Sequence, residues 1–321
     1  MTSKERVYRA IEFKSPDAVP VYYFNGAVEK GDLVCFDVKR SSAFNDRDKA
    51  WSEWGYTWQK LDDTMGQPDG IVINDYAQLS SYVPPKADAA GRFDGLEEFI
   101  QKYKEKFIMV GPDITGFTIV TFLRGFENTL IDFYEDMENL QKIIDMVFGY
   151  ELGLIEKICG YKDVDAFSFH DDYGSQRAMF ISPDTFREIF LPQYKKQFDL
   201  LHKHGKKVFF HSCGNVFDII PDLISAGVDI FNFNQPDVMG LDKLSGFRGQ
   251  VAFNCPVDLQ KVALNGTKQQ IFDYTERMIK QLGTERGGFI GYLEEYHSIG
   301  LTDENYRYCE EALQTGGYYD T

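Results

Sequence analysis

A histidine and a cysteine two residues apart follow an apolar run in the second half of the chain. The run Lys207–Phe210 has the pattern of a buried strand, and His211, Ser212 and Cys213 follow it directly. Because side chains alternate between the two faces of a strand, His211 and Cys213 would project to the same side. An imidazole and a thiolate together favour Zn²⁺ over Mg²⁺ or Ca²⁺. The spacing therefore predicts a zinc site, and inert buried side chains are the alternative.

Further candidate ligands follow two later runs of the same kind. Cys255 follows Val251–Asn254, and Glu295 and His297 follow Phe289–Leu293. If these runs are parallel strands of one barrel, their carboxyl ends meet at one mouth. We predict that Cys255, together with an acid such as Glu295 or with His297, completes the metal shell. The alternative is that Cys255 belongs to the core and His297 forms hydrogen bonds within a loop.

Two adjacent carboxylates, Asp171 and Asp172, stand just beyond the apolar run Ala166–Phe169. Either one would serve as a general acid if its surroundings raised its pKa. In the alternative interpretation, one caps a turn and the other pairs with Arg124 or Arg177.

Aromatic and amide side chains gather at the ends of the predicted strands and indicate a pocket for a planar ligand. Filling of the barrel core is the alternative for those that point between layers. The residues that we predict to bind the substrate are Tyr22, Phe24, Phe169, Tyr173, Gln176 and Asn234.

The strands that must position these residues alternate with helical patterns. From about residue 107 onward the alternation continues to the end, so the fold class is α/β, and a closed (β/α)₈ TIM barrel is the simplest architecture. The predicted strands are Val19–Phe24, Leu33–Val38, Phe107–Val110, Ala166–Phe169, Lys207–Phe210, Val228–Phe233, Val251–Asn254 and Phe289–Leu293.

Residues 39–106 form an unusually long connection between the second and third predicted strands. This connection contains Trp51, Trp54 and Trp58, whose helical spacing favours a packing stripe, with a binding platform as the alternative. We expect a helical or hairpin insertion over the barrel mouth, within a single barrel domain that spans residues 1–321.

The composition limits the partners. Lys and Arg total 34 and Asp and Glu total 50, so the formal net charge is −16, which argues against nucleic acid or an anionic membrane. No apolar stretch reaches the roughly 18 residues of a membrane span, and the first residues lack the pattern of a signal peptide. The five cysteines are scattered and imply no disulfide framework, so we expect a cytoplasmic protein with reduced thiols.

The chain resembles the uroporphyrinogen decarboxylase superfamily, and more closely its branch of zinc-dependent, corrinoid-linked methyltransferases. The strongest segments of the resemblance are residues 170–176, 211–215 and 256–260. It implies a (β/α)₈ barrel with its active site at the C-terminal mouth, where His211 and Cys213 match the zinc-binding His-x-Cys pair of that branch. Thiol-methylating members take a further Cys from the loop after the last strand, and this chain offers Glu294, Glu295 and His297 there.

The resemblance implies an enzyme that moves a methyl group between a methylated small molecule and the cobalt of a methylcobalamin-type corrinoid on a separate protein. The aromatic mouth favours a methoxylated aromatic compound that is demethylated. The decarboxylase itself needs an Arg-rich segment after the first strand, and residues 22–29 contain no Arg. A metal-independent decarboxylase for a smaller substrate is the alternative, and a non-catalytic barrel that only binds a corrinoid protein is the third.

Overall fold

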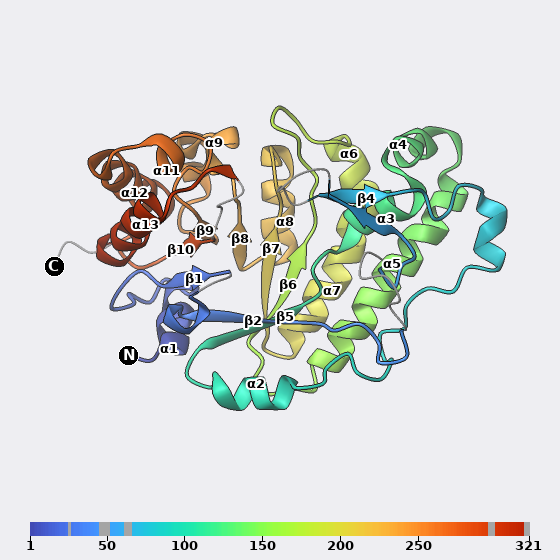
Figure 1. The fold of residues 1–321 in the computed structure, drawn as a ribbon, viewed down its shortest axis with the longest axis horizontal. Helices are drawn as coiled ribbons and strands as arrows, with labels where there is room; N and C mark the ends of the chain where they lie inside the picture. The colour runs from blue at the N-terminus through green and yellow to red at the C-terminus, as the bar shows by residue number, and fades with distance from the viewer. Residues whose placement is uncertain (25–26, 45–51, 61–65, 295–298, 318–321) are drawn as a thin grey trace.

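Eight parallel strands close into a barrel in the computed structural model, which describes residues 1–24, 27–44, 52–60, 66–294 and 299–317 (Figure 1). Each predicted strand overlaps one of them, and the (β/α)₈ architecture is confirmed. Around the barrel the order is β1-β10-β9-β8-β7-β6-β5-β2. The bounds are β1 (Val21–Tyr23), β2 (Leu33–Asp37), β5 (Phe107–Gly111), β6 (Ala166–His170), β7 (Lys207–His211), β8 (Ile230–Asn232), β9 (Ala252–Cys255) and β10 (Phe289–Leu293).

Alternation along each strand divides the apolar side chains into two layers. Tyr22, Phe209 and Tyr292 belong to the cluster that fills the barrel, whereas Phe169 and Phe210 belong to the larger cluster between the strands and the helices. Both layers are apolar because a parallel barrel has no face open to water.

Helices with clear start signals surround the strands. Thr2, Asp136, Thr267 and Thr302 each cap the first turn of a helix with a side-chain oxygen. The helices are α1 (Ser3–Ile11), α2 (Leu96–Lys102), α3 (Gly116–Arg124), α4 (Phe126–Glu135), α5 (Met137–Ile158), α6 (Pro183–Thr185), α7 (Leu191–Lys203), α8 (Ile220–Ala226), α9 (Pro236–Met239), α10 (Leu241–Leu244), α11 (Val262–Asn265), α12 (Lys268–Leu282) and α13 (Asp303–Thr315). Among the described residues, no helix is long and apolar enough to cross a bilayer.

The connection 39–106 contains a short hairpin, β3 (Thr57–Gln59) and β4 (Gln67–Asp69), before it reaches α2. The hairpin lies beside α3 and α4 near the C-terminal ends of the strands, whereas α2 lies at the opposite end of the barrel (Figure 1). Trp54 is 8% exposed and packs on Tyr150, and Trp58 packs on Phe122. These two tryptophans therefore have packing partners, and Trp51 lies outside the described residues.

Candidate metal centre

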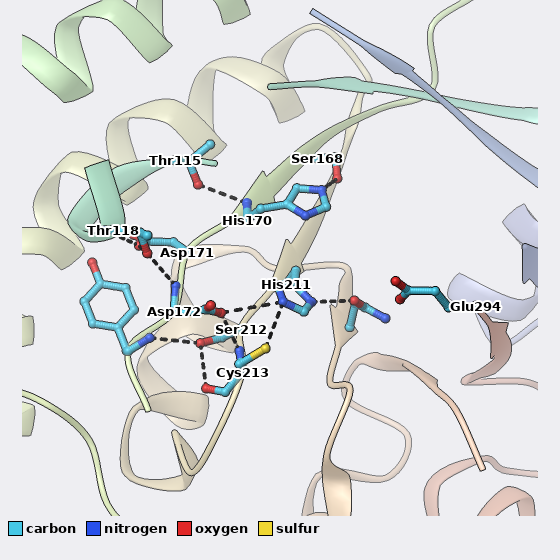
Figure 2. Close-up of polar contacts among 12 residues, drawn as sticks. Thr115, Thr118, Ser168, His170, Asp171, Asp172, His211, Ser212, Cys213 and Glu294 are labelled. Carbon is cyan, nitrogen blue, oxygen red and sulfur yellow. Dashed lines mark hydrogen bonds and ion pairs between the residues drawn. The ribbon is translucent and has the colours of Figure 1, made fainter. Parts of the chain in front are cut away.

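Asp172, His211 and Cys213 converge at the C-terminal mouth of the barrel (Figure 2). Each offers one ligand atom, and these atoms lie within 4.8 Å of one another. The Cys213 Sγ atom is 3.4 Å from His211 Nε2, which is 3.6 Å from Asp172 Oδ1. His211 ends β7, and Asp172 stands two residues beyond the end of the neighbouring strand β6. The mixture of nitrogen, sulfur and oxygen donors fits Zn²⁺.

Backbone contacts between two loops hold Asp172 beside Cys213. The Cys213 N–H donates to Asp172 Oδ1 at 2.7 Å, and the Asp172 N–H donates to the Thr118 hydroxyl at 2.9 Å. A Cβ atom on Gly214 would lie 2.2 Å from the carbonyl oxygen of Gly174, so only glycine permits this approach of the loops. The φ angle of +74° at Gly214 adds a second reason for glycine there.

The surroundings of the Cys213 thiol disfavour its thiolate form unless a cation binds beside it. Burial raises its pKa well above the usual value, and the carboxylates of Asp172 and Glu294 raise it further. A bound divalent ion would reverse this balance, because it stabilises a thiolate and neutralises the neighbouring carboxylate. The site residues therefore fit the metal that the sequence predicts.

Glu294 is the acid after β10 that faces this site. Its carboxylate points in the direction of His211 in Figure 2. It accepts a hydrogen bond from the Tyr292 hydroxyl at 2.6 Å. Glu295 and His297, which the sequence suggested as ligands, lie outside the described residues. The alternation of side chains along a strand could have identified Glu294 from the sequence. Tyr292 points into the barrel, and Glu294, two residues later, lies on the same side.

Asp171 requires a correction, because its side chain turns away from the mouth. It is 0% exposed, and its carboxylate accepts hydrogen bonds from the N–H groups of Phe117 and Thr118 at 2.8 Å, the Thr118 hydroxyl and the Tyr194 hydroxyl. Burial raises its pKa to about 6. Asp171 caps the start of α3, where a Cβ on Gly116 would lie 1.9 Å from its Oδ2. These contacts agree with the alternative interpretation of the sequence, in which one of the two aspartates is a cap.

Cys255, Phe169 and Tyr173 also differ from their predicted positions. All are 0% exposed and belong to the cluster between the strands and the helices. The reason is alternation: His170 and Asn254 point into the barrel, so Phe169 and Cys255 point outward. The ring of Tyr173 packs against the rings of Phe117 and Phe186 in this outer layer. Among the described residues, Cys255 therefore lies outside the cluster of Asp172, His211 and Cys213, and both aromatic side chains are buried in the outer layer of the core.

The remaining aromatic predictions form one wall of the mouth. The ring of Tyr22 packs edge-on against Phe24 and Tyr292, with centroid distances of 6.3 and 5.7 Å. Phe24 is 43% exposed, whereas Tyr22 and Tyr292 are 3% exposed each. The wall thus presents one ring to a ligand and two supporting rings beneath it.

Two polar predictions lie around the same mouth. Gln176 is exposed and links three loops, since its amide donates to Gln235 at 2.7 Å and accepts from Gln260 at 3.0 Å. Asn234 follows β8 and is partly buried.

Sequence reasoning missed a pair of acids on the wall of the mouth that adjoins the metal site, where β5 pairs with β6. Asp37 ends β2, and Asp113 stands two residues beyond the neighbouring strand β5. Both are exposed at the mouth, yet restricted hydration together with the charge of Asp113 raises the pKa of Asp37 to about 6. Restricted hydration also raises the pKa of Asp113. A carboxylate at a predicted strand end was the available signal for both.

Comparisons with known proteins agree with this architecture. Residues 68–293 match the family model described as uroporphyrinogen decarboxylase (URO-D). A methylated-thiol–coenzyme M methyltransferase of Methanosarcina mazei is 23% identical over 206 residues, which are 63% of this chain and 54% of that protein. The chain thus spans about half the length of this relative.

A solved structure described as a methyltransferase from Methanosarcina mazei covers 98% of this chain, and the match covers 98% of that chain. The TM-score is 0.66 and the sequence identity is 15%. This similarity shows a shared fold.

Proposed function

We propose that this chain, which belongs to the uroporphyrinogen decarboxylase family, is a zinc-dependent methyltransferase. Its reaction moves a methyl group between a methylated small molecule and the cobalt of a separate corrinoid protein. The observation that carries the proposal is the convergence of Asp172, His211 and Cys213 at the barrel mouth. The name of the curated relative, a methyltransferase, supports the same kind of reaction.

The three converging residues are the proposed zinc ligands, with Glu294 as the candidate for a fourth. Zinc bound there supplies Lewis acidity, which stabilises negative charge on the heteroatom that gives up or receives the methyl group. In this proposal Asp172 is a metal ligand rather than the general acid that the sequence predicts, and the hydrogen bond from the Cys213 N–H fixes the direction of its carboxylate. Glu295 and His297 stay candidates for the same shell.

The aromatic wall supports a methoxylated aromatic compound as the substrate. Phe24 offers a ring to stack on, and Tyr22 and Tyr292 hold that ring in place. Gln176 and Asn234 are the proposed polar contacts at the edge of the pocket. The carboxylates of Asp37, Asp113 and Glu294 at the mouth disfavour a polyanionic substrate such as a porphyrinogen.

In the demethylating direction, the bond between oxygen and the methyl carbon would break, and the Co(I) centre of the partner's corrinoid would supply both electrons for the new bond to that carbon. The oxygen would leave with the electron pair of the broken bond and would need a proton. We assign the donation of that proton to Asp37, because an acid with a pKa of about 6 holds its proton in a useful fraction of molecules near neutral pH. Alignment of the reacting atoms by the site contributes several kcal/mol, with an upper limit on the order of 10.

The proposal is tested with purified protein, a panel of methoxylated aromatic compounds and free cob(I)alamin. We expect stoichiometric zinc by elemental analysis and zinc-dependent appearance of methylcobalamin in the absorption spectrum. Protein that lacks zinc after purification and reconstitution would contradict the proposal. Release of carbon dioxide from a small carboxylated substrate by metal-free protein would support the decarboxylase alternative instead.

A further inference from the structure

We infer that Asn232 and Asn254 lock His211 into the tautomer whose Nε2 atom presents a lone pair to the metal. The inference rests on the metal site proposed above and concerns two positioning residues that do not contact the metal. It follows from the hydrogen bonds that cross the interior of the barrel behind His211.

These side chains occupy one layer of the barrel. His211 is in register with Asn232 on β8, which is in register with Asn254 on β9, next to Ile290 on β10. The His211 Nδ1 atom is 2.6 Å from Asn232 Oδ1, and the Asn232 amide nitrogen is 2.8 Å from Asn254 Oδ1. The Asn254 amide nitrogen is 3.2 and 3.1 Å from the main-chain oxygens of Ile290 and Gly291. Both asparagines are at most 2% exposed.

The direction of this relay is set at its far end. The two carbonyls on β10 only accept hydrogen bonds, so the amide nitrogen of Asn254 faces them and its oxygen faces Asn232. Asn232 therefore turns its amide nitrogen to Asn254, where it also donates to the main-chain oxygen at 3.0 Å. Its oxygen is left facing His211. An amide oxygen only accepts, so His211 must carry its hydrogen on Nδ1.

The consequence lies on the other side of the imidazole ring. With Nδ1 protonated, neutral His211 has its lone pair on Nε2, the atom 3.4 Å from the Cys213 sulfur and 3.6 Å from an Asp172 oxygen. Hydrogen-bond partners that hold a ligating histidine in this way commonly raise metal affinity 10–100-fold.

An amide relay also has an electrostatic consequence. Amides do not titrate, so the direction of the relay is independent of pH. An asparagine adds no negative charge to a site where Asp172 and Glu294 already act on the Cys213 thiol. His170, the neighbouring histidine in the layer, provides the contrast: its Nε2 faces the Ser168 hydroxyl at 2.6 Å, and a hydroxyl both donates and accepts.

The first test measures the tautomer directly in metal-free protein. Long-range ¹H–¹⁵N NMR at pH 8 on protein with ¹⁵N-labelled histidine, assigned with a His211→Gln variant, should show protonated Nδ1 and unprotonated Nε2 at His211. The opposite tautomer would overturn the inference. This measurement does not depend on zinc, so a failure to bind zinc would count against the proposed function and leave the tautomer to be decided separately.

The second test measures zinc affinity by competition with a chromogenic chelator. Asn232→Leu should weaken zinc binding about 10–100-fold, and Asn254→Leu should weaken it several-fold although it contacts neither His211 nor the metal. Asn232→Asp keeps an acceptor for Nδ1 but loses the donor to Asn254, so its zinc affinity should lie between those of Asn232→Leu and the parent.

The matched control is Asn305→Leu. Asn305 also donates to three main-chain oxygens, those of Ala263, Leu264 and Gly266, but it belongs to α13 and has no hydrogen bond to the metal site. Its loss should leave zinc affinity unchanged. If Asn232→Leu binds zinc within about twofold of the parent, or if the control variant loses as much affinity, the relay does not position His211.

Discussion

Two walls of the barrel mouth are built alike and yet differ in chemistry. On one wall the paired strands β6 and β7 end with Asp172, His211 and Cys213, and on the other the paired strands β2 and β5 end with Asp37 and Asp113. The first wall mixes donor types, so a cation can satisfy all of them. The second wall offers two carboxylates, and limited hydration together with the charge of Asp113 raises the pKa of Asp37 instead. The same topology thus yields a ligand set or an acid, according to residue type.

The largest expected effect comes from removing a proposed metal ligand from the first wall. Cys213→Ala removes a ligand, so zinc content should fall to below about a tenth of the parent value and methyl transfer should be lost, while the barrel stays folded. Elemental analysis and circular dichroism measure the two results. Cys159→Ala, at the end of α5, is the matched control and should keep its zinc. Full zinc occupancy in Cys213→Ala would exclude this thiol as a ligand.

A second comparison separates the two adjacent aspartates. Asp172→Asn keeps an acceptor for the Cys213 N–H but loses the charge, so kcat should fall about 10–100-fold with a small change in KM. Asp171→Asn, which weakens the cap of α3, should instead lower the free energy of unfolding by about 1–3 kcal/mol. Steady-state kinetics and urea unfolding distinguish these outcomes. Equal turnover in the parent and Asp172→Asn would make Asp172 a structural residue.

The second wall is probed by pH. If Asp37 acts as an acid, kcat should decline about tenfold per pH unit above its pKa of about 6. Asp113→Asn removes the like charge, lowers the pKa of Asp37 and should move this decline to lower pH. If Asp113→Asn does not shift the pH at which kcat declines, the decline reports the titration of a group other than Asp37.

The raised pKa of Asp37 also makes the stability of the folded protein depend on pH. The folded protein binds this proton more tightly than the unfolded chain, so the contribution of Asp37 to the free energy of unfolding is largest below pH 4. That contribution should be lost as the pH rises through about 6. Urea unfolding of the parent and Asp37→Asn at pH 4.5 and 7 measures the difference. A difference that is independent of pH would contradict the assignment.

The smallest effect is expected at the aromatic wall. Phe24→Ala removes the exposed ring and leaves Tyr22 and Tyr292 in place, so KM for an aromatic substrate should rise about 3–10-fold with kcat nearly unchanged. Phe126→Ala, an equally exposed ring on α4, is the control. A large fall in kcat for Phe24→Ala would mean that this ring aligns the reacting atoms.

The sequence by itself determined the barrel, because eight short apolar runs separated by helical patterns leave few other ways to cover both faces of the strands. It also placed His211 and Cys213 on one side, since the period of two is a local property of the strand. It could not say which side faces the interior. That parity sends Asn254 inward and Cys255 outward, and Phe169 outward beside His170.

Only the tertiary structure decided which acids serve the mouth. Asp171 and Asp172 are neighbours in sequence, but their side chains have different partners. Asp171 caps the start of α3, whereas Asp172 accepts a hydrogen bond from the Cys213 N–H at the mouth. Asp37 and Asp113 come from strands that the long connection 39–106 separates, and the parallel pairing of β2 with β5 brings them together. Such pairings depend on distances between distant segments, and local periodicity carries no information about them.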